Sequence, residues 1–245
     1  MGTDGIHEAW NWIVERWTAS AEPSQTALYV AAGIILATLL VPQVWHLARN
    51  ALTIVHEMGH VLAAVLVGRR VQGIRLHSDT SGLAVTRGKP RGPGVLFVAL
   101  AGYPAPGIVG LVLVWAAAAG YSGASLVLLV VLLLAALLLV RNVWGVLVLL
   151  VSLAGSGLVL WSNESSLVTT VVIVLGLFLA LGAPRAAWDL VRSHLRRGAS
   201  HSDATLAAGA VGGPAVLWLT VFVLVTCGTA AATLWFVATT MWGVG

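Results

Sequence analysis

Charged residues and cysteines are both scarce in this sequence. Only 9% of its 245 residues are Asp, Glu, Lys or Arg, whereas 59% are hydrophobic and the mean hydropathy is +0.95. Because soluble domains carry about 25% charged residues, this composition excludes a soluble globular protein and predicts an integral membrane protein. The stretches without an apolar run, at 1–25, 69–93 and 184–212, are too short for a sizeable domain outside the membrane.

The single cysteine, Cys227, lies inside an apolar run. It rules out an intrachain disulfide framework and a cysteine zinc cluster. A net charge of +4 and a pI near 10 could indicate nucleic-acid binding in a soluble protein. In a membrane protein, the excess of Lys and Arg in cytoplasmic loops explains both values more simply. We therefore expect a lipid bilayer around the protein and no nucleic-acid partner.

Apolar runs of about 20 residues are long enough to cross a bilayer as helices. The sequence therefore predicts an all-α polytopic membrane protein with a single transmembrane domain over 26–240. It contains about seven transmembrane helices, at 26–46, 50–68, 93–119, 123–140, 144–161, 166–183 and 213–240. Prolines inside the third of them predict a kink.

The residues before the first span, 1–25, form a separate segment. Trp10, Ile13, Val14 and Trp17 recur every three to four residues, which predicts a short helix lying at the membrane interface. A disordered acidic tail is the alternative interpretation.

The positions of Lys and Arg predict how the spans are oriented. With seven spans and a cytoplasmic N-terminus, 12 of the 13 Lys and Arg residues fall on the cytoplasmic side, and only Arg49 falls outside. We therefore expect a multi-pass protein of the cell membrane with its N-terminus in the cytoplasm. On the same side, a Ser/Asp/Thr/Gly cluster between apolar residues predicts a β-hairpin at 70–87, and 184–197 reads as an amphipathic surface helix.

The second predicted span contains the H-E-x-x-H sequence His56-Glu57-Met58-Gly59-His60. Residues i and i+4 share one helix face, so both imidazoles can bind one Zn²⁺ ion with Glu57 beside it as general base. Gly59 would let another backbone approach closely. A chance polar face is the alternative, but each ionisable residue at membrane depth costs about 2.5 to 3.5 kcal/mol, which favours a metal site.

The order of these elements resembles the site-2 protease family of intramembrane zinc metalloproteases. The resemblance rests on H-E-x-x-H in a span, on the hairpin, and on the Ala101-Gly102-Tyr103-Pro104 sequence in the next span; it is closest to the short bacterial branch without a PDZ domain. It implies hydrolysis of peptide bonds in or near transmembrane segments of other membrane proteins. It also implies that the hairpin, at Gly82 and Leu83, pairs with an unwound substrate helix as an added strand. Tyr103, Pro104 and Asn142 are further expected substrate contacts.

The third zinc ligand departs from the family pattern. The family has an aspartate in a later span within an N-x-x-P-x-P-x-L-D-G type motif, and the nearest equivalent here, around Asn142, has no aspartate. Among the nine acidic residues, Asp203 ranks first because it precedes the last span on the cytoplasmic side, in a Ser-Asp-Ala sequence similar to that of the short branch. Asn142 ranks second and His201 third. The alternative is that Ser202 or Asp203 only caps a helix.

Two other functions compete with the protease hypothesis. A catalytically silent relative could keep the metal site and act as a membrane regulatory or binding protein, and the missing family aspartate supports it. A transporter would need buried ionisable residues on further spans, and the predicted fourth and sixth spans have none.

Overall fold

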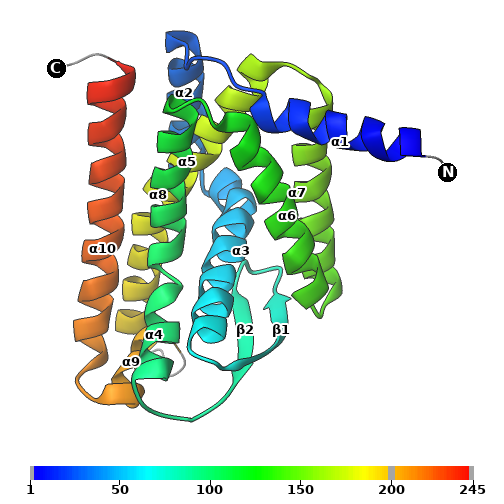
Figure 1. The fold of residues 1–245 in the computed structure, drawn as a ribbon. Coiled ribbons are helices and arrows are strands. Elements are labelled where there is room, and N and C mark those ends of the chain that lie inside the picture. Colours follow the sequence, from blue (N-terminus) through cyan, green and yellow to red (C-terminus); the bar gives the residue numbers. More distant parts are fainter. Residues whose placement is uncertain (1–2, 198–201, 243–245) are drawn as a thin grey trace.

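The computed structural model describes residues 3–197 and 202–242 as a helical bundle with one small sheet (Figure 1). Its elements, in chain order, are α1 (Thr3–Thr18), α2 (Gln25–Leu40), α3 (Pro42–Leu66), β1 (Arg70–Leu76), β2 (Gly82–Arg87), α4 (Pro93–Ala101), α5 (Pro104–Ala118), α6 (Ser122–Leu139), α7 (Val143–Trp161), α8 (Ser165–Arg197), α9 (Asp203–Val211), α10 (Ala215–Phe236) and the π-helical turn η1 (Val237–Met241).

Four helices are long and apolar enough to cross a membrane by themselves: α6, α7, α8 and α10. Two bent pairs, α2 with α3 and α4 with α5, bring the number of candidate spans to six if each pair is one broken span. The predicted multi-pass helical architecture is therefore confirmed at this level. The predicted count of seven spans is not.

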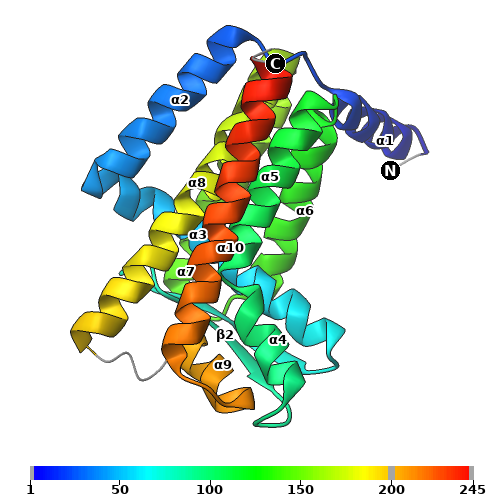
Figure 2. The ribbon, with the colours of Figure 1, turned by 90° about the vertical axis from the view of Figure 1, so that its left-hand side faces the viewer.

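The boundary predicted between 46 and 50 is wrong, because the chain breaks at Val41 instead. Val41 is extended, with φ −92° and ψ 113°, and α2 and α3 meet there at 105° (Figure 2). Pro42 explains the position, since proline disfavours a helical conformation in the residue before it and is well tolerated at a helix start. The predicted kink in 93–119 lies at Gly102 and Tyr103, where α4 and α5 are bent by 54°.

Residues 184–197, expected as a separate surface helix, instead continue α8 through Pro184. A proline inside a helix removes one backbone hydrogen bond. Ala183 and Ala187 on either side of the proline are both buried against neighbouring elements. Packing along the whole helix thus offsets the local cost of the proline.

The predicted hairpin forms a two-stranded antiparallel sheet whose strands pair from Arg70 with Arg87 to Leu76 with Gly82, with an irregularity between Val71 and Gly73. Its buried face carries Ile74 and Leu76, which pack with α6 and α7 residues.

The far edge of β1 is occupied by the link between α6 and α7. Arg141 donates its backbone N–H to the Ile74 carbonyl at 2.9 Å, and Val140 forms a parallel bridge with Ile74. The sheet is thereby fixed to the bundle along one edge.

Helix α1 forms as predicted, but it lies at the end of the bundle opposite the hairpin (Figure 1). Its Arg16 side chain bonds to Asn163 in the α7–α8 turn, and the backbone of Ala21 exchanges hydrogen bonds with the Thr169 hydroxyl at 3.0 and 3.2 Å. The other end of α7 adjoins β1. The arrangement therefore does not support the expectation that the N-terminus and the hairpin share the cytoplasmic side.

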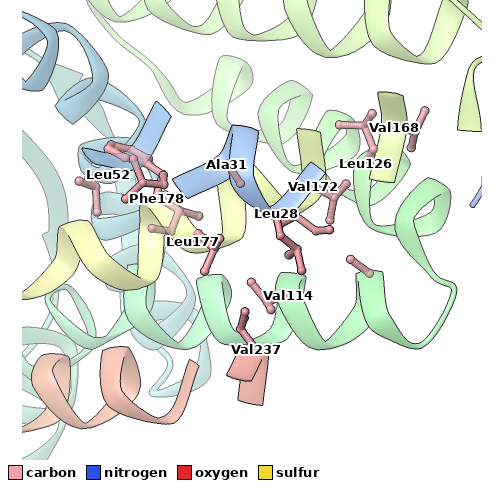
Figure 3. Close-up of a cluster of buried hydrophobic side chains, with 14 of the residues drawn as sticks. Leu28, Ala31, Leu52, Val114, Leu126, Val168, Val172, Leu177, Phe178 and Val237 are labelled. Atoms are coloured by element: carbon pink, nitrogen blue, oxygen red, sulfur yellow. The ribbon is translucent and has the colours of Figure 1, made fainter. Parts of the chain in front are cut away.

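The largest apolar core lies between α2, α5 and α8. Figure 3 shows Leu28 and Ala31 of α2 meeting Val114 of α5 and Val172 of α8, all at most 2% exposed. Nearby, a Cβ at Gly110 would lie 2.5 Å from the backbone of α8, so α5 and α8 touch through their backbones. Because α2, α5 and α8 also contact α3, this core supports the helix that carries the H-E-x-x-H sequence.

Candidate metal centre

Three side chains from two elements far apart in sequence converge beside the α4–α5 kink. The Nε2 atoms of His56 and His60 on α3 are 3.0 Å apart. The Oδ2 atom of Asp203, the first residue of α9, lies 3.2 Å from both of them. The structure thus brings the two histidines of the motif together with Asp203, the first-ranked candidate for the third ligand. His201, the third-ranked candidate, lies outside the described residues.

Helix α9 presents Asp203 because a different residue caps it. The Ser202 hydroxyl accepts the Thr205 backbone N–H at 3.3 Å, and the Thr205 hydroxyl accepts the Ser202 N–H at 2.8 Å, which completes a capping box. Asp203 is therefore free of the capping role and faces the histidines. Ala204 and Ala207 are fully buried and fix the helix against its neighbours.

The electrostatic surroundings of Asp203 favour its ionised form. Burial would raise the pKa of its carboxyl group, but the adjacent charge of His60 and hydrogen bonds with both histidines lower that pKa below its ordinary value. An ionised carboxylate is the form that binds a cation.

The His60 ring is oriented by a backbone carbonyl. Its Nδ1 lies 2.7 Å from the Val98 oxygen of α4. Since a carbonyl can only accept, Nδ1 carries a proton, so Nε2 is the ring nitrogen that can bind a metal in place of a proton. Sequence reasoning missed Val98, because a backbone contact leaves no signature in residue type.

Two glycines allow α3 to approach the α4–α5 kink this closely. A Cβ at Gly59 would lie 2.7 Å from the Ala101 carbonyl oxygen, which confirms the predicted close backbone approach. A Cβ at Gly102 would lie 2.5 Å from the His60 ring and 2.6 Å from the His56 ring. Gly102 was overlooked as a site residue, although its place beside Tyr103-Pro104 was a visible signal.

Glu57 lies beside the three converging groups and is only 3% exposed. Its Oε2 atom has no hydrogen-bond partner among the described residues, while a Cβ at Gly82 would overlap its Oε1. A buried carboxylate oxygen without a partner is costly unless a water or a cation occupies the space in front of it.

The donor set fits zinc. The ligand atoms of His56, His60 and Asp203 all lie within 4.8 Å of one another. Two imidazoles and a carboxylate are the ligands of catalytic zinc sites that keep a fourth position open.

A cavity of about 640 Å³ opens in front of these groups, between α3, β2 and α8. The outer edge of β2 lines it. The backbone groups of Ile74 and Leu76 bond to the α6–α7 link and not to β2. Their cross-strand partners, Ala84 and Gly82, therefore belong to non-hydrogen-bonded pairs, in which the N–H and C=O groups point away from the neighbouring strand. The backbone groups of Gly82 and Ala84 therefore point into the cavity, where the Ala84 N–H faces Glu57.

The other predicted contacts divide into two groups. The Tyr103 ring lies 4.7 Å from the His56 ring and stacks on Phe222 at 5.0 Å, Pro104 begins α5, and Leu83 is 53% exposed at the cavity. Asn142 instead faces β1: its side-chain oxygen accepts the Leu76 N–H at 3.1 Å, and its amide donates to the Leu76 carbonyl.

A further contact absent from the sequence reasoning fixes the hairpin turn to α3. The Thr53 hydroxyl donates to the Thr80 carbonyl at 2.8 Å, and Thr80 is buried with a φ of 67°. At the turn, bonds from the Ser81 hydroxyl and backbone N–H lower the pKa of the Asp79 carboxyl. These bonds fix the conformation of the turn beside the face of α3 that carries His56 and Glu57.

A family model described as Peptidase M50B-like matches residues 29–233, a range that includes α3, the hairpin and Asp203. Comparisons with curated proteins and with solved structures gave no significant match. The model covers most of the chain and agrees with the resemblance drawn from the H-E-x-x-H span. The chain therefore belongs to the peptidase M50B-like family of site-2-protease-type membrane proteins.

Proposed function

We propose that this protein is an intramembrane zinc metalloprotease that hydrolyses peptide bonds in or near transmembrane segments of other membrane proteins. The observation that carries the proposal is the convergence of His56, His60 and Asp203 beside the Glu57 carboxylate, whose Oε2 atom has no hydrogen-bond partner among the described residues. Membership of the M50B-like family supports the same class of activity.

His56, His60 and Asp203 would hold the ion, which leaves one coordination position open. When bound, zinc lowers the pKa of a water to about 7 and polarises a substrate carbonyl. Glu57 Oε2, which has no hydrogen-bond partner among the described residues, would hold the attacking water and accept its proton, and Glu57 would then pass that proton to the leaving amine. The Val98 carbonyl keeps the His60 ring in its ligand orientation throughout.

The substrate would bind as an extended strand along the outer edge of β2. A peptide bond inside a helix is shielded by its own hydrogen bonds, and an unwound segment needs new partners that lipid cannot supply. The backbone groups of Gly82 and Ala84 supply them within reach of Glu57, and the far edge of β1 is already occupied. Leu83, Tyr103 and Pro104 would line the bound segment.

We further propose that the hairpin end of the bundle faces the cytoplasm. This end carries most of the basic residues outside the spans, among them Arg69, Arg70, Arg75, Arg87, Lys89, Arg91 and Arg141. Since α1 lies at the opposite end, the N-terminal helix would then be extracytoplasmic, with both bent helix pairs acting as single spans. Cysteine labelling from outside in a Cys227→Ala background tests this: Ser20→Cys should react and Ser81→Cys should not, and the reverse result would refute the orientation.

The activity is tested by reconstituting the purified protein with a candidate single-span substrate. Wild-type protein should cleave it, removal of zinc by a chelator should stop cleavage, and added zinc should restore it. Glu57→Gln should retain zinc and lose activity by about 10²- to 10⁴-fold, the usual contribution of a general base. Full turnover by Glu57→Gln would contradict the mechanism. Retained zinc without cleavage of any tested substrate by the wild type would favour the silent relative.

A further inference from the structure

The face of the hairpin turned away from the bundle is strongly basic. Because side chains alternate along a strand, the pairing places Arg70 and Arg87 on one face, together with Arg75 and its partner Leu83. All four are exposed, whereas Ile74 and Leu76 on the opposite face are buried.

A fourth arginine, Arg141 of the α6–α7 link, joins this face. A Cβ at Gly73 would lie 2.6 Å from Arg141 Cγ, so the Arg141 side chain crosses β1 at the one position where the strand has no side chain. Its guanidinium donates to the Leu138 carbonyl at 2.8 Å. We call Arg70, Arg75, Arg87 and Arg141 together the basic face.

The basic face is not neutralised within the part of the chain that the structure describes. The arginine ion pairs in residues 3–197 and 202–242 join Arg16 to Glu15 and Arg49 to Asp189, and neither involves the hairpin. Arg70 and Arg87 are direct cross-strand partners. Like charges directly opposite each other destabilise a sheet, so this arrangement favours an anion that contacts both guanidinium groups.

The position of Arg141 places the basic face at the boundary between apolar and polar surroundings. Arg141 lies between the end of α6 and the start of α7, both of which are candidate spans. Leu138 and Val143 on either side of it are each 76% exposed, and Trp144 is 38% exposed. Exposed aliphatic residues next to a tryptophan and an arginine are typical of the level of lipid headgroups.

We propose that the basic face binds the headgroups of anionic phospholipids. Guanidinium groups form bidentate hydrogen bonds with phosphate oxygens, and the exposed Leu138 and Val143 beside Arg141 can contact the acyl boundary. A bound lipid would relieve the repulsion between Arg70 and Arg87. It would thereby stabilise β2, whose unpaired edge lines the cavity beside Glu57. Lipid binding stands by itself, whereas a gain in proteolytic activity from it rests on the proposed function.

The test measures lipid selectivity of the full-length protein, independently of proteolysis. Wild type is reconstituted in phosphatidylcholine vesicles that contain spin-labelled phosphatidylglycerol or spin-labelled phosphatidylcholine, and the motionally restricted fraction of each is measured. Arg70→Gln/Arg87→Gln is compared with Arg192→Gln/Arg196→Gln, which removes the same charge from the end of α8. We expect the wild type to select phosphatidylglycerol. Each hairpin arginine removed should lower that selectivity about 5-fold, the fold-change that corresponds to ~1 kcal/mol for a basic residue near an anionic surface.

Three outcomes would overturn the proposal. One is a wild type without phosphatidylglycerol selectivity, and another is an equal loss in the α8 control, which would indicate a general effect of net charge. The third is an unchanged selectivity in the hairpin variant combined with a raised KM for a substrate that has acidic residues beside its span, which would make the substrate the partner. Zinc content checks that the variant is folded. If it is not, Arg75→Gln, which lacks a charged cross-strand partner, should still lower the selectivity by the single-residue amount.

Discussion

The buried threonine hydroxyls in one half of the bundle differ from the buried ligand groups in the other half. In the half built on α5, α8 and α10, the buried hydroxyls of Thr226 and Thr233 each bond to a carbonyl of their own helix, at 2.7 and 2.8 Å. In the half around α3, three ligand atoms crowd within 4.8 Å and Glu57 Oε2 has no described partner. The first half stabilises the fold through packing. The second half leaves the ligand atoms and Glu57 Oε2 available to bind a cation and a water.

The largest effect that should separate the two halves is the loss of the proposed third ligand. Asp203→Ala should weaken zinc binding by more than 100-fold, because even partners that only orient a ligand contribute about 10- to 100-fold. Asn142→Ala, which removes a side chain bonded to β1 instead, should leave zinc affinity within a few-fold of wild type. Competition with a fluorescent zinc chelator measures both. Equal losses in the two variants would remove Asp203 from the site.

Adding one methyl group at the kink should disturb the site without a loss of charge. In Gly102→Ala the new Cβ would meet both histidine rings at 2.5 to 2.6 Å, so the rings must move. We expect zinc affinity to fall about 10- to 100-fold, as for a disturbed ligand orientation. The matched control is Gly155→Ala on α7, where a Cβ meets nothing within 4 Å. Wild-type affinity in Gly102→Ala would show that the kink does not constrain the ligands.

The same change in the packed half should affect stability and spare the metal. In Gly110→Ala the Cβ would meet α8 backbone atoms at 2.5 Å, and overpacking of this kind costs about 1 to 3 kcal/mol. Thermal unfolding in detergent should therefore shift to lower temperature, with zinc content per folded chain unchanged. A loss of zinc before any loss of folded protein would mean that the two halves are not separable.

The smallest effect should come from the anchor of the hairpin. Asn142→Ala removes two hydrogen bonds to Leu76, each worth about 0.5 to 1.5 kcal/mol. Leu76 pairs with Gly82 at the cavity, so the KM for a substrate strand should rise several-fold while kcat changes little. Asn142→Asp, which keeps the acceptor and loses the donor, should fall between Ala and wild type. A fall in kcat alone would indicate direct participation in the chemistry instead.

Local spacing was sufficient to predict the centre of the site. The helical repeat brings His56, Glu57 and His60 to one face, and the turn residues at 78–82 predict the hairpin between them and the next span. Asp203 could be proposed as the third zinc ligand because the chain has only nine acidic residues, which can be considered one by one. Its approach to within 3.2 Å of both histidines depends on how α9 folds back, which composition does not encode.

The errors concern elements in which tertiary packing outweighs local signals. Hydropathy gave a continuous span to residue 46 and missed the break at Val41, because Pro42 changes the backbone without changing the apolar character of the run. Pro184 predicts a boundary between two helices, yet α8 continues through it and packs against its neighbours. The positions of α1 and of the link that follows it depend on contacts with Asn163 and Thr169, about 150 residues away in sequence, and no local pattern predicts such contacts.

The most direct test of the central claim is zinc X-ray absorption spectroscopy of the purified wild-type protein, with the metal content determined on the same sample. The site as described predicts about one zinc per chain, with nitrogen and oxygen ligands near 2.0 to 2.1 Å and an imidazole scattering pattern that indicates two histidines. Absence of zinc, or scattering from a single histidine, would contradict the assignment of His56, His60 and Asp203 as one metal centre.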